Sequence, residues 1–595
     1  MGLARLRSRL TLPAVPTRRI LGLAAGLLCL MLGLAGCVTR PAPVPLRLLA
    51  FNDFHGHLLA AESGTVDVPD PQDGTPRRLR AGGAAHLAAL IAQRRAGVPH
   101  ALVLSTGDLV GASPLTSALF RDEPTIEVMN LIGLDANVVG NHEFDKGVAE
   151  LMRLIRGGCA APVPESPLDS CAGPEGRFPG ARFTMLGANV VDAAGQAVLP
   201  PALVRRIGPV RVGLVGAVTR TTPTIVSPAG VSGLRFEDEA QAINRQVRAL
   251  REQGVEAIIA LVHEGGAAQA GPGHEGDCSQ ARGEIFQIID RLDPAVDLVL
   301  SGHTHQVYNC VRRGIRVIQG GSYGRLLSEV DLLLDPASGD VIRGSVRAIN
   351  RPVANGLDTR AADRGAVAVV PPDATVAARV AHYAALAAPR SAREVGRLLA
   401  PATLAAAPGG DSPAGRLVAD AQLAATRGAA EGGAQIALMN PGGVRAELRP
   451  RNAEGVVSYG DAFAMQPFGN SLVTMSLSGA QLLAVLEQQW AGVNRDRARI
   501  LQPSAGFQYR WEARAPAGAR VVPGSLRLHG EPIEPARNYR VTVNSFLAEG
   551  GDGFSLFTEG RERLGGAQDL DALLAWLRSR SPLMPETTPR IERAD

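Results

Sequence analysis

Between residues 46 and 350, this 595-residue chain alternates short apolar runs with amphipathic segments, and the alternation constrains its fold more than any other feature. The runs are rich in Val, Ile and Leu and are bounded by turn residues, which is typical of strands buried on both faces. Amphipathic patterns at 84–95 and 239–252 predict helices between them. An α/β domain is therefore predicted, with strands at 46–51, 101–105, 136–139, 210–217, 257–262, 297–300 and 317–318.

Polar side chains that can bind metal ions stand where five of these runs end. Ligands of α/β sheets collect outside the carboxyl ends of the strands, so we expect these side chains to lie together. One such histidine would most simply be a buried core residue, but five strands ending this way indicate a site. The residues, in chain order, are Asp53, His55, Asp108, Asn141, His142, His263, His303 and His305.

The spacing within these motifs has a structural reason. Asp53 and His55 are two residues apart, as are His303 and His305, so each pair points to one side as its strand ends. Glycines beside the ligands permit tight turns and a close approach of the backbone. Mixed Asp, Asn and His ligands suit zinc, manganese, iron or cobalt better than magnesium. His57 follows closely but has no place in this ligand set.

The motifs Gly-Asn-His-Glu-Phe-Asp, Ser-Thr-Gly-Asp and Ser-Gly-His-Thr-His resemble those of calcineurin-like metallophosphoesterases, specifically the 5′-nucleotidase/UDP-sugar hydrolase family. The resemblance runs from about residue 46 to 558. It implies an α/β (α+β) fold, with a four-layer β-sandwich flanked by helices and a separate α/β substrate domain.

The resemblance also implies two divalent metal ions. One ion would be bound by Asp53, His55, Asp108 and His305. The other would be bound by Asp108, Asn141, His263 and His303, so that Asp108 bridges the two. His142 and Asp145 would face the phosphate and stabilise the transition state. The implied reaction is attack of a metal-bound hydroxide on the phosphorus of a nucleoside 5′-monophosphate.

The C-terminal half carries motifs that would select the substrate. The segment from Asn440 to Arg445 resembles a family motif whose Asn contacts the base and whose Arg contacts the phosphate. Loops containing Phe468 and Phe554 resemble those whose aromatic rings enclose the nucleobase, and stacking contributes about 1–3 kcal/mol per base. Segment 405–411 departs from the family pattern, because it lacks the arginines that relatives use to bind phosphate.

The N-terminus is typical of an export signal. Basic residues end at Arg19, an apolar run follows at 20–34, and the run is short for a membrane-spanning helix. The sequence before Cys37 resembles a lipoprotein lipobox, with Cys37 acylated; an uncleaved anchor and a twin-arginine route are alternatives. The five arginines of residues 1–36 exceed the formal charge of +4, leaving −1 for the rest. The body therefore does not indicate a partner of polymeric nucleic acid.

Four cysteines would remain in the exported chain, where disulfides persist. Of three possible pairings we favour the local one, Cys159 with Cys171 and Cys278 with Cys310, because short loops close easily. Free buried thiols are an alternative, and a zinc site is disfavoured without close Cys-x-x-Cys spacing.

Composition divides the chain into six parts. They are a signal at 1–36, a tether at 37–45, a metallophosphoesterase domain at 46–350, a linker with a helix at 351–390, a substrate domain at 391–580 and a tail at 581–595.

Other functions share these features. The same metal site could serve a 2′,3′-cyclic-nucleotide phosphodiesterase, a nucleotide-sugar hydrolase or a thiosulfohydrolase. A surface-binding lipoprotein with a vestigial site is the non-enzyme alternative, which the complete ligand set disfavours. The expected partners are a small nucleotide and a membrane reached through Cys37. The sequence leaves the oligomeric state open.

Overall fold

The computed structural model describes residues 41–61, 63–69, 76–161, 169–226, 228–268, 276–358 and 367–595. The expected signal at 1–36 and the expected lipidated residue Cys37 lie outside these ranges. Within the ranges, no helix is both long enough and apolar enough to span a bilayer.

Two seven-stranded sheets form the N-terminal domain. The first has the order β17 (Asp340–Val341), β16 (Leu326–Asp335), β1 (Val44–Phe51), β4 (Ala101–Ser105), β5 (Ala136–Val138), β6 (Thr184–Leu186), with β18 (Arg347–Pro352) also on β16. The second has the order β12 (Gly276–Asp277), β14 (Val307–Arg312), β15 (Ile315–Gly320), β13 (Leu298–Ser301), β11 (Ala257–His263), β9 (Val210–Val218), β8 (Ala202–Ile207). Each of the seven predicted runs lies in one of these strands.

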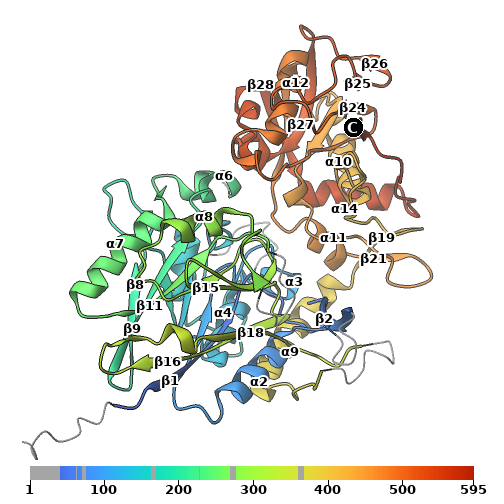
Figure 1. Cartoon of the computed structure of the whole chain (residues 1–595). Helices are drawn as coiled ribbons and strands as arrows, with labels where there is room; N and C mark the ends of the chain where they lie inside the picture. Colours follow the sequence, from blue (N-terminus) through green and yellow to red (C-terminus); the bar gives the residue numbers. More distant parts are fainter. Residues whose placement is uncertain are drawn as a thin grey trace, which may run out of the picture.

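The two sheets pack face to face and helices cover their outer faces, as expected for the four-layer fold (Figure 1). Leu48 and Leu104 of the first sheet share a buried cluster with Leu214 and Leu261 of the second. One outer layer contains α2 (Ala84–Arg95), α4 (Glu123–Ile132) and α5 (Gly147–Arg156), and the other contains α7 (Glu239–Glu252) and α8 (Glu284–Arg291).

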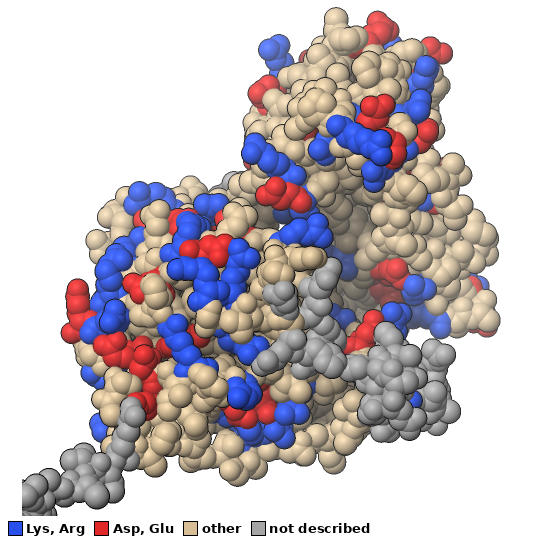
Figure 2. Space-filling view, viewed as in Figure 1, with Lys and Arg blue, Asp and Glu red and all other residues tan. Residues whose placement is uncertain are grey.

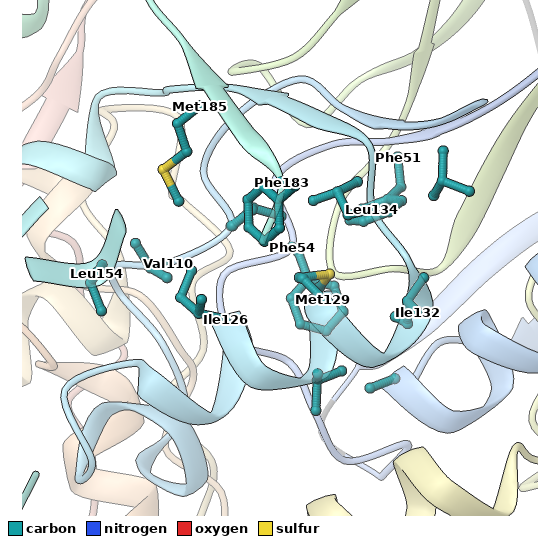
Figure 3. Close-up of a cluster of buried hydrophobic side chains, with 14 of the residues drawn as sticks. Phe51, Phe54, Val110, Ile126, Met129, Ile132, Leu134, Leu154, Phe183 and Met185 are labelled. Atoms are coloured by element: carbon teal, nitrogen blue, oxygen red, sulfur yellow. The ribbon is translucent and has the colours of Figure 1, made fainter. Parts of the chain in front are cut away.

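A second buried cluster holds the chain that follows β1 in place. Figure 3 shows Phe51 and Phe54 packed with Ile126 and Met129 of α4 and with Phe183. Full burial of one such side chain contributes about 1.5–3 kcal/mol. The cluster therefore fixes the loop that carries the first predicted ligands.

The structure contains both favoured disulfides, Cys159–Cys171 and Cys278–Cys310. The second disulfide joins Cys310 of β14 to Cys278, which directly follows β12. β12 and β14 pair in parallel at the edge of their sheet.

In the C-terminal domain, β19 (Glu394–Arg397) pairs with β21 (Val456–Ser458), and two larger sheets form the rest. Their orders are β23 (Gln502–Pro503), β20 (Ile436–Met439), β27 (Asn538–Asn544), β22 (Ser471–Ser478), β28 (Arg561–Gln568), and β26 (Glu531–Pro532), β25 (Arg527–Leu528), β24 (Phe507–Trp511), β29 (Ile591–Arg593). The helices include α10 (Pro413–Thr426), α11 (Tyr459–Met465), α12 (Gly479–Glu487), α13 (Ser545–Ala548) and α14 (Asp569–Ser579).

The last residues do not form a separate tail, contrary to the prediction for 581–595. β29 pairs in parallel with β24, and Ile591 is buried in the core of this domain. The backbone groups at the edge of β24 pair with this segment. The sequence of a polar terminal segment does not show that such an edge is available to it.

The predicted linker helix is α9 (Ala374–Ser391), which packs on α2 and α4. Tyr383 of α9 donates a hydrogen bond to Glu127 of α4 over 3.0 Å and lies against Phe120. Phe120 and Tyr383 belong to a buried apolar cluster that also includes residues of α10, α11 and α14. The two domains are therefore joined by a continuous apolar core as well as by the chain.

Candidate metal centre and nucleotide cleft

The structure brings the predicted ligands together at the carboxyl ends of β1, β4, β5, β11 and β13. Two groups that match the predicted sites have ligand atoms within 4.8 Å of one another: Asp53 with His55 and His305, and Asp108 with His263 and His303. A third such group joins His55 and Asp108 to His142. Asn141 joins the second group, because its Oδ1 lies 3.2 Å from His263 Nε2.

Asp108 lies between the two groups. Its Oδ2 is 3.1 Å from His263 Nε2 and 3.7 Å from His55 Nε2. On the far side, His305 Nε2 lies 3.2 Å from His55 Nε2 and 3.3 Å from Asp53 Oδ1. A carboxylate at this position can bridge two cations, as the family resemblance implies.

The backbone at these positions is strained. Asp53, His55, Asp108, His303 and His305 have φ between 46° and 72°. A non-glycine residue in this region costs on the order of 1–3 kcal/mol and persists only when its surroundings impose it. Here two loops bond to each other, because the Asp53 and His55 amides donate to the carbonyls of Gly107 and Asp108 over 3.0 and 2.9 Å.

Two glycines make this close packing possible. A Cβ at Gly140 would lie 2.1 Å from Asp108 Oδ1, and one at Gly107 would lie 2.4 Å from His263 Nδ1. No side chain fits at either position. The predicted need for glycine beside the ligands has this physical cause.

Hydrogen bonds orient the imidazoles toward the centre. The Nδ1–H of His55 donates to the Gly111 carbonyl over 2.8 Å, and that of His263 donates to the Thr106 carbonyl over 2.7 Å. In both rings Nε2 is left to face the carboxylates. Fixing the tautomer in this way is characteristic of metal-binding histidines.

The protonation of the imidazoles follows their surroundings. Burial lowers the pKa of His55 and of His303 well below the usual value, so both rings are neutral and able to bind a cation. Burial also acts to lower the pKa of His263, but the Asp108 carboxylate outweighs it and raises that pKa to about 10. The field that holds a proton on His263 is one that attracts a divalent ion.

Sequence reasoning missed two residues that support this edge. Glu143 is buried and accepts hydrogen bonds from the amides of Asp108 and Leu109 over 3.0 and 2.8 Å, holding the loop after β4. Asn52 donates to Asp53 Oδ2 over 2.6 Å and so orients that carboxylate. Both stand directly beside the motif residues, and that adjacency was the available signal.

His142 and Asp145 form a pair beside the centre. Asp145 Oδ2 lies 2.7 Å from His142 Nδ1, and the His142 amide donates to Asp108 Oδ1 over 2.9 Å. Burial acts to lower the pKa of His142, but Asp145 and Asp108 raise it overall. The two carboxylates therefore favour the positively charged form of the imidazole at the rim of the metal edge.

A cavity of about 660 Å³ adjoins both domains. Its lining includes Asp108, Asn141 and His142 from one domain and Asn440, Arg445 and Phe468 from the other. Figure 2 shows the surface hollowed where the two domains meet, with basic and acidic side chains interspersed over the N-terminal domain. The volume is in the range of small-molecule sites.

Arg445 and Phe468 lie closest to the metal edge among the predicted substrate residues. The Phe468 ring is stacked on His142 with centroids 5.9 Å apart, and the Arg445 guanidinium lies 5.9 Å from the Phe468 centroid. Asn440 is buried deeper and donates to Asp552 Oδ2 over 2.8 Å.

Phe554 does not line the cavity, so the prediction that its ring encloses the nucleobase is wrong. Its side chain is fully buried in the core of the C-terminal domain, with its ring 6.2 Å from that of Phe557. Phe546 of α13 lines the cavity instead. A Cβ at Gly551 would lie 2.5 Å from the Phe546 ring, so the glycine-rich loop that contains Phe554 serves to accommodate Phe546.

Segment 405–411 brings no arginine to the cavity. Arg416, the next arginine along the chain, is buried and donates to Asp411 over 2.6 Å. Two arginines that the sequence analysis passed over, Arg497 and Arg499, line the cavity instead. Their motif carries no glycine-rich or ligand-like signature, and only the fold shows where they lie.

Comparison with known proteins matches two family models in succession. Residues 46–307 match the calcineurin-like phosphoesterase model, and residues 391–559 match the 5′-nucleotidase C-terminal domain model. A solved 5′-nucleotidase precursor from Thermus thermophilus superposes with a TM-score of 0.70 at 25% identity, covering 92% of this chain and 99% of that one.

Curated relatives differ in length and in name. Endonuclease YhcR of Bacillus subtilis is 29% identical over 90% of this chain, and the cell wall protein Lmo0130 of Listeria monocytogenes is 30% identical over 86%. This chain spans 40% and 64% of those two proteins. A 5′-nucleotidase of Diplobatis ommata is 24% identical, covering 98% of this chain and 95% of its own length.

Proposed function

The chain belongs to the 5′-nucleotidase family, and we propose that it is a metal-dependent phosphoester hydrolase that releases phosphate from nucleoside 5′-monophosphates. The observation that carries the proposal is the shared cavity, in which metal-binding side chains and Arg445, Phe468 and Phe546 face one space. We also propose that residues 46–350 supply the metal site, 391–580 the substrate residues and 351–390 the linker.

The residues present fit two divalent ions. Asp53, His55, Asp108 and His305 would hold one, and Asp108, Asn141, His263 and His303 the other. Imidazoles and carboxylates converge there, which suits zinc, manganese, iron or cobalt. Ions bound there neutralise phosphoryl oxygens and lower the pKa of a bound water.

His142 supplies a positive charge where the phosphoryl group would lie. Asp145 accepts a hydrogen bond from its Nδ1–H and thereby orients the ring, and the neighbouring carboxylates favour its protonated form by raising its pKa. Such a cation stabilises charge that develops on the phosphoryl and leaving oxygens in the transition state.

Arg445, Phe468, Phe546 and Asn440 would bind the rest of the substrate. The Arg445 guanidinium has no hydrogen bond or ion pair among the described residues and is close enough to the metal edge for its charge to act on His55 and His142. It would contact the phosphate. The two aromatic rings would enclose the base, which contributes about 1–3 kcal/mol.

Export is part of the proposal. Its support is the N-terminal pattern ending at Cys37 and a relative named as a cell wall protein. We propose a lipoprotein of the cell envelope that is anchored through Cys37.

A second candidate has support from the composition of the cleft. Without arginines at 405–411, the contacts to a single phosphate depend mainly on Arg445, which favours nucleotide sugars or 2′,3′-cyclic nucleotides more than a full set of arginines would. A thiosulfohydrolase and a binding lipoprotein remain alternatives with the same architecture.

Rates of phosphate release separate these functions. The full chain, loaded with manganese or zinc, is assayed on AMP, UDP-glucose, 2′,3′-cAMP and a sugar phosphate. The proposal predicts the highest kcat/KM for AMP. A higher value for UDP-glucose or the cyclic nucleotide would transfer the assignment to that substrate. No turnover of any phosphoester would favour the thiosulfohydrolase or the binding protein.

A further inference from the structure

The loop at 495–499 places two arginines in the lining of the cavity, Arg497 and Arg499, which differ in their polar contacts. Arg499 is held: its Nε lies 3.4 Å from Asp552 Oδ1, and its Nη1 donates to Asn494 Oδ1 over 2.9 Å. Asn494 in turn donates to the Asp552 carbonyl over 2.8 Å. The base of the loop is thus tied to the glycine-rich loop that accommodates Phe546.

Arg497 is exposed to the cavity and makes no hydrogen bond or ion pair with any residue that the structure describes. The carboxylates that line the cavity are already engaged: Asp122 with Lys146, Asp145 with His142, and Asp552 with Asn440 and Arg499. Asp108 belongs to the metal centre. Each carboxylate that lines the cavity therefore has another partner, and none of them forms an ion pair with Arg497.

Arg445 is the other lining arginine whose guanidinium lacks a polar partner in the described chain, and the two lie in different parts of the cavity. Arg445 lies by Phe468, which is stacked on His142 at the metal edge. Arg497 lies toward Asp552, and its charge opposes the rise in the pKa of Asp552 that burial causes. The charge of Arg445 acts on the pKa of both Asp552 and His142. Arg445 therefore lies between the metal edge and the part of the cavity near Asp552.

Arg445 lies by the metal edge and Arg497 lies toward Asp552, so a phosphate bound at the metal edge beside Arg445 leaves Arg497 without an anion. We infer that Arg497 binds a second anionic group of the substrate, a phosphate other than the one that is hydrolysed, and that Arg499 positions its loop. The inference rests on the proposed function, because it takes the first phosphate to lie at the metal edge beside Arg445. The substrates would then include nucleotides with two phosphates as well as nucleoside 5′-monophosphates.

A second phosphate has two sources. It can stand in the same 5′ chain, as in ADP, or on a ribose hydroxyl, as in adenosine 3′,5′-bisphosphate. Both present the anionic oxygens that an arginine binds in charge-assisted hydrogen bonds.

The test compares Arg497→Ala with Arg495→Ala. Arg495 is exposed in the same loop but does not line the cavity, so its removal changes the charge equally without touching the site. For each variant, kcat/KM is measured on AMP, ADP and adenosine 3′,5′-bisphosphate at fixed ionic strength.

In Arg497→Ala, the ratio of kcat/KM for a two-phosphate substrate to that for AMP should fall about tenfold, mainly through KM. In Arg495→Ala it should not change. The substrate that shows the fall identifies the source of the second phosphate. An unchanged ratio for both substrates in Arg497→Ala would overturn the inference, since Arg497 would then contact nothing or a group that AMP shares.

Failure of the proposed function would look different. If the wild-type chain turned over none of the three nucleotides, that function would fall, and calorimetric binding of the same nucleotides to the same variants would still decide the role of Arg497. Equal affinity of wild type and Arg497→Ala for all three would overturn it.

Discussion

The metal edge and the substrate end of the cavity share one space but are built in different ways. At the metal edge, each side chain follows directly from the end of a strand, the backbone is strained, and hydrogen bonds fix the rings of His55 and His263. At the substrate end, Arg445 and Arg497 come from separate loops and lack polar partners among the described residues. Such an arrangement is rigid where chemistry occurs and adaptable where the substrate is selected.

The largest effect should come from breaking the centre of the metal edge. Asp108→Asn removes the carboxylate that lies between the two groups, and we expect kcat/KM on AMP to fall about 10,000-fold, with loss of bound metal. Metal content is measured by elemental analysis after dialysis. Asp122→Asn, the same change in a cavity carboxylate outside both groups, is the matched control and should retain the ions.

The next effect should separate catalysis from metal binding. His142→Asn removes the protonated imidazole that Asp145 orients, and kcat should fall about 100- to 1,000-fold with metal content unchanged. Steady-state kinetics and metal analysis on one preparation check this. Loss of metal from this variant would mean that His142 is itself a ligand.

A pair of substitutions sharpens the corrected assignment at the substrate end. Phe546→Ala should raise KM for AMP about tenfold by removing a stacking ring, with little change in Tm. Phe554→Ala should instead lower the free energy of unfolding by about 3–5 kcal/mol, because its ring fills the core. Kinetics and thermal unfolding of both variants are measured side by side. The opposite pattern would restore Phe554 as the stacking residue.

The smallest effect on catalysis is expected at Arg416. Arg416→Met should leave KM for AMP unchanged, because the guanidinium is buried against Asp411 and does not line the cavity. It should nevertheless cost about 3–5 kcal/mol of unfolding free energy, since Asp411 loses its partner in the interior. A raised KM in the folded variant would show that Arg416 contacts phosphate.

The two ends also differ in how far sequence predicted them. The ligands from Asp53 to His305 were predictable because strand ends in an α/β sheet converge, so a local pattern determines a position in space. Glu143 and Asn52 were missed because their role depends on which amides and carboxylates fold against them. The apolar runs predicted an α/β domain, and the family resemblance implied its four-layer arrangement, whereas β29 was missed because its partner strand is distant in sequence.

At the substrate end, the glycine-rich loop motif led to the wrong aromatic residue. Phe554 and Phe546 stand eight residues apart around one glycine-rich loop, and which ring enters the cavity depends on how that loop packs. Arg497 and Arg499 lie in a segment with no recognisable motif, and Arg499 is held at the cavity by contacts with Asn494 and Asp552. Substrate residues of this kind require the fold before they can be assigned.

The most direct test of the central claim is a metal titration of phosphate release. The full chain is stripped with a chelator, and release of phosphate from AMP is followed as manganese or zinc is added stepwise. The account predicts no release from the stripped chain and a rate that saturates at two ions per chain. Release that survives chelation, or that never returns with metal, would contradict it.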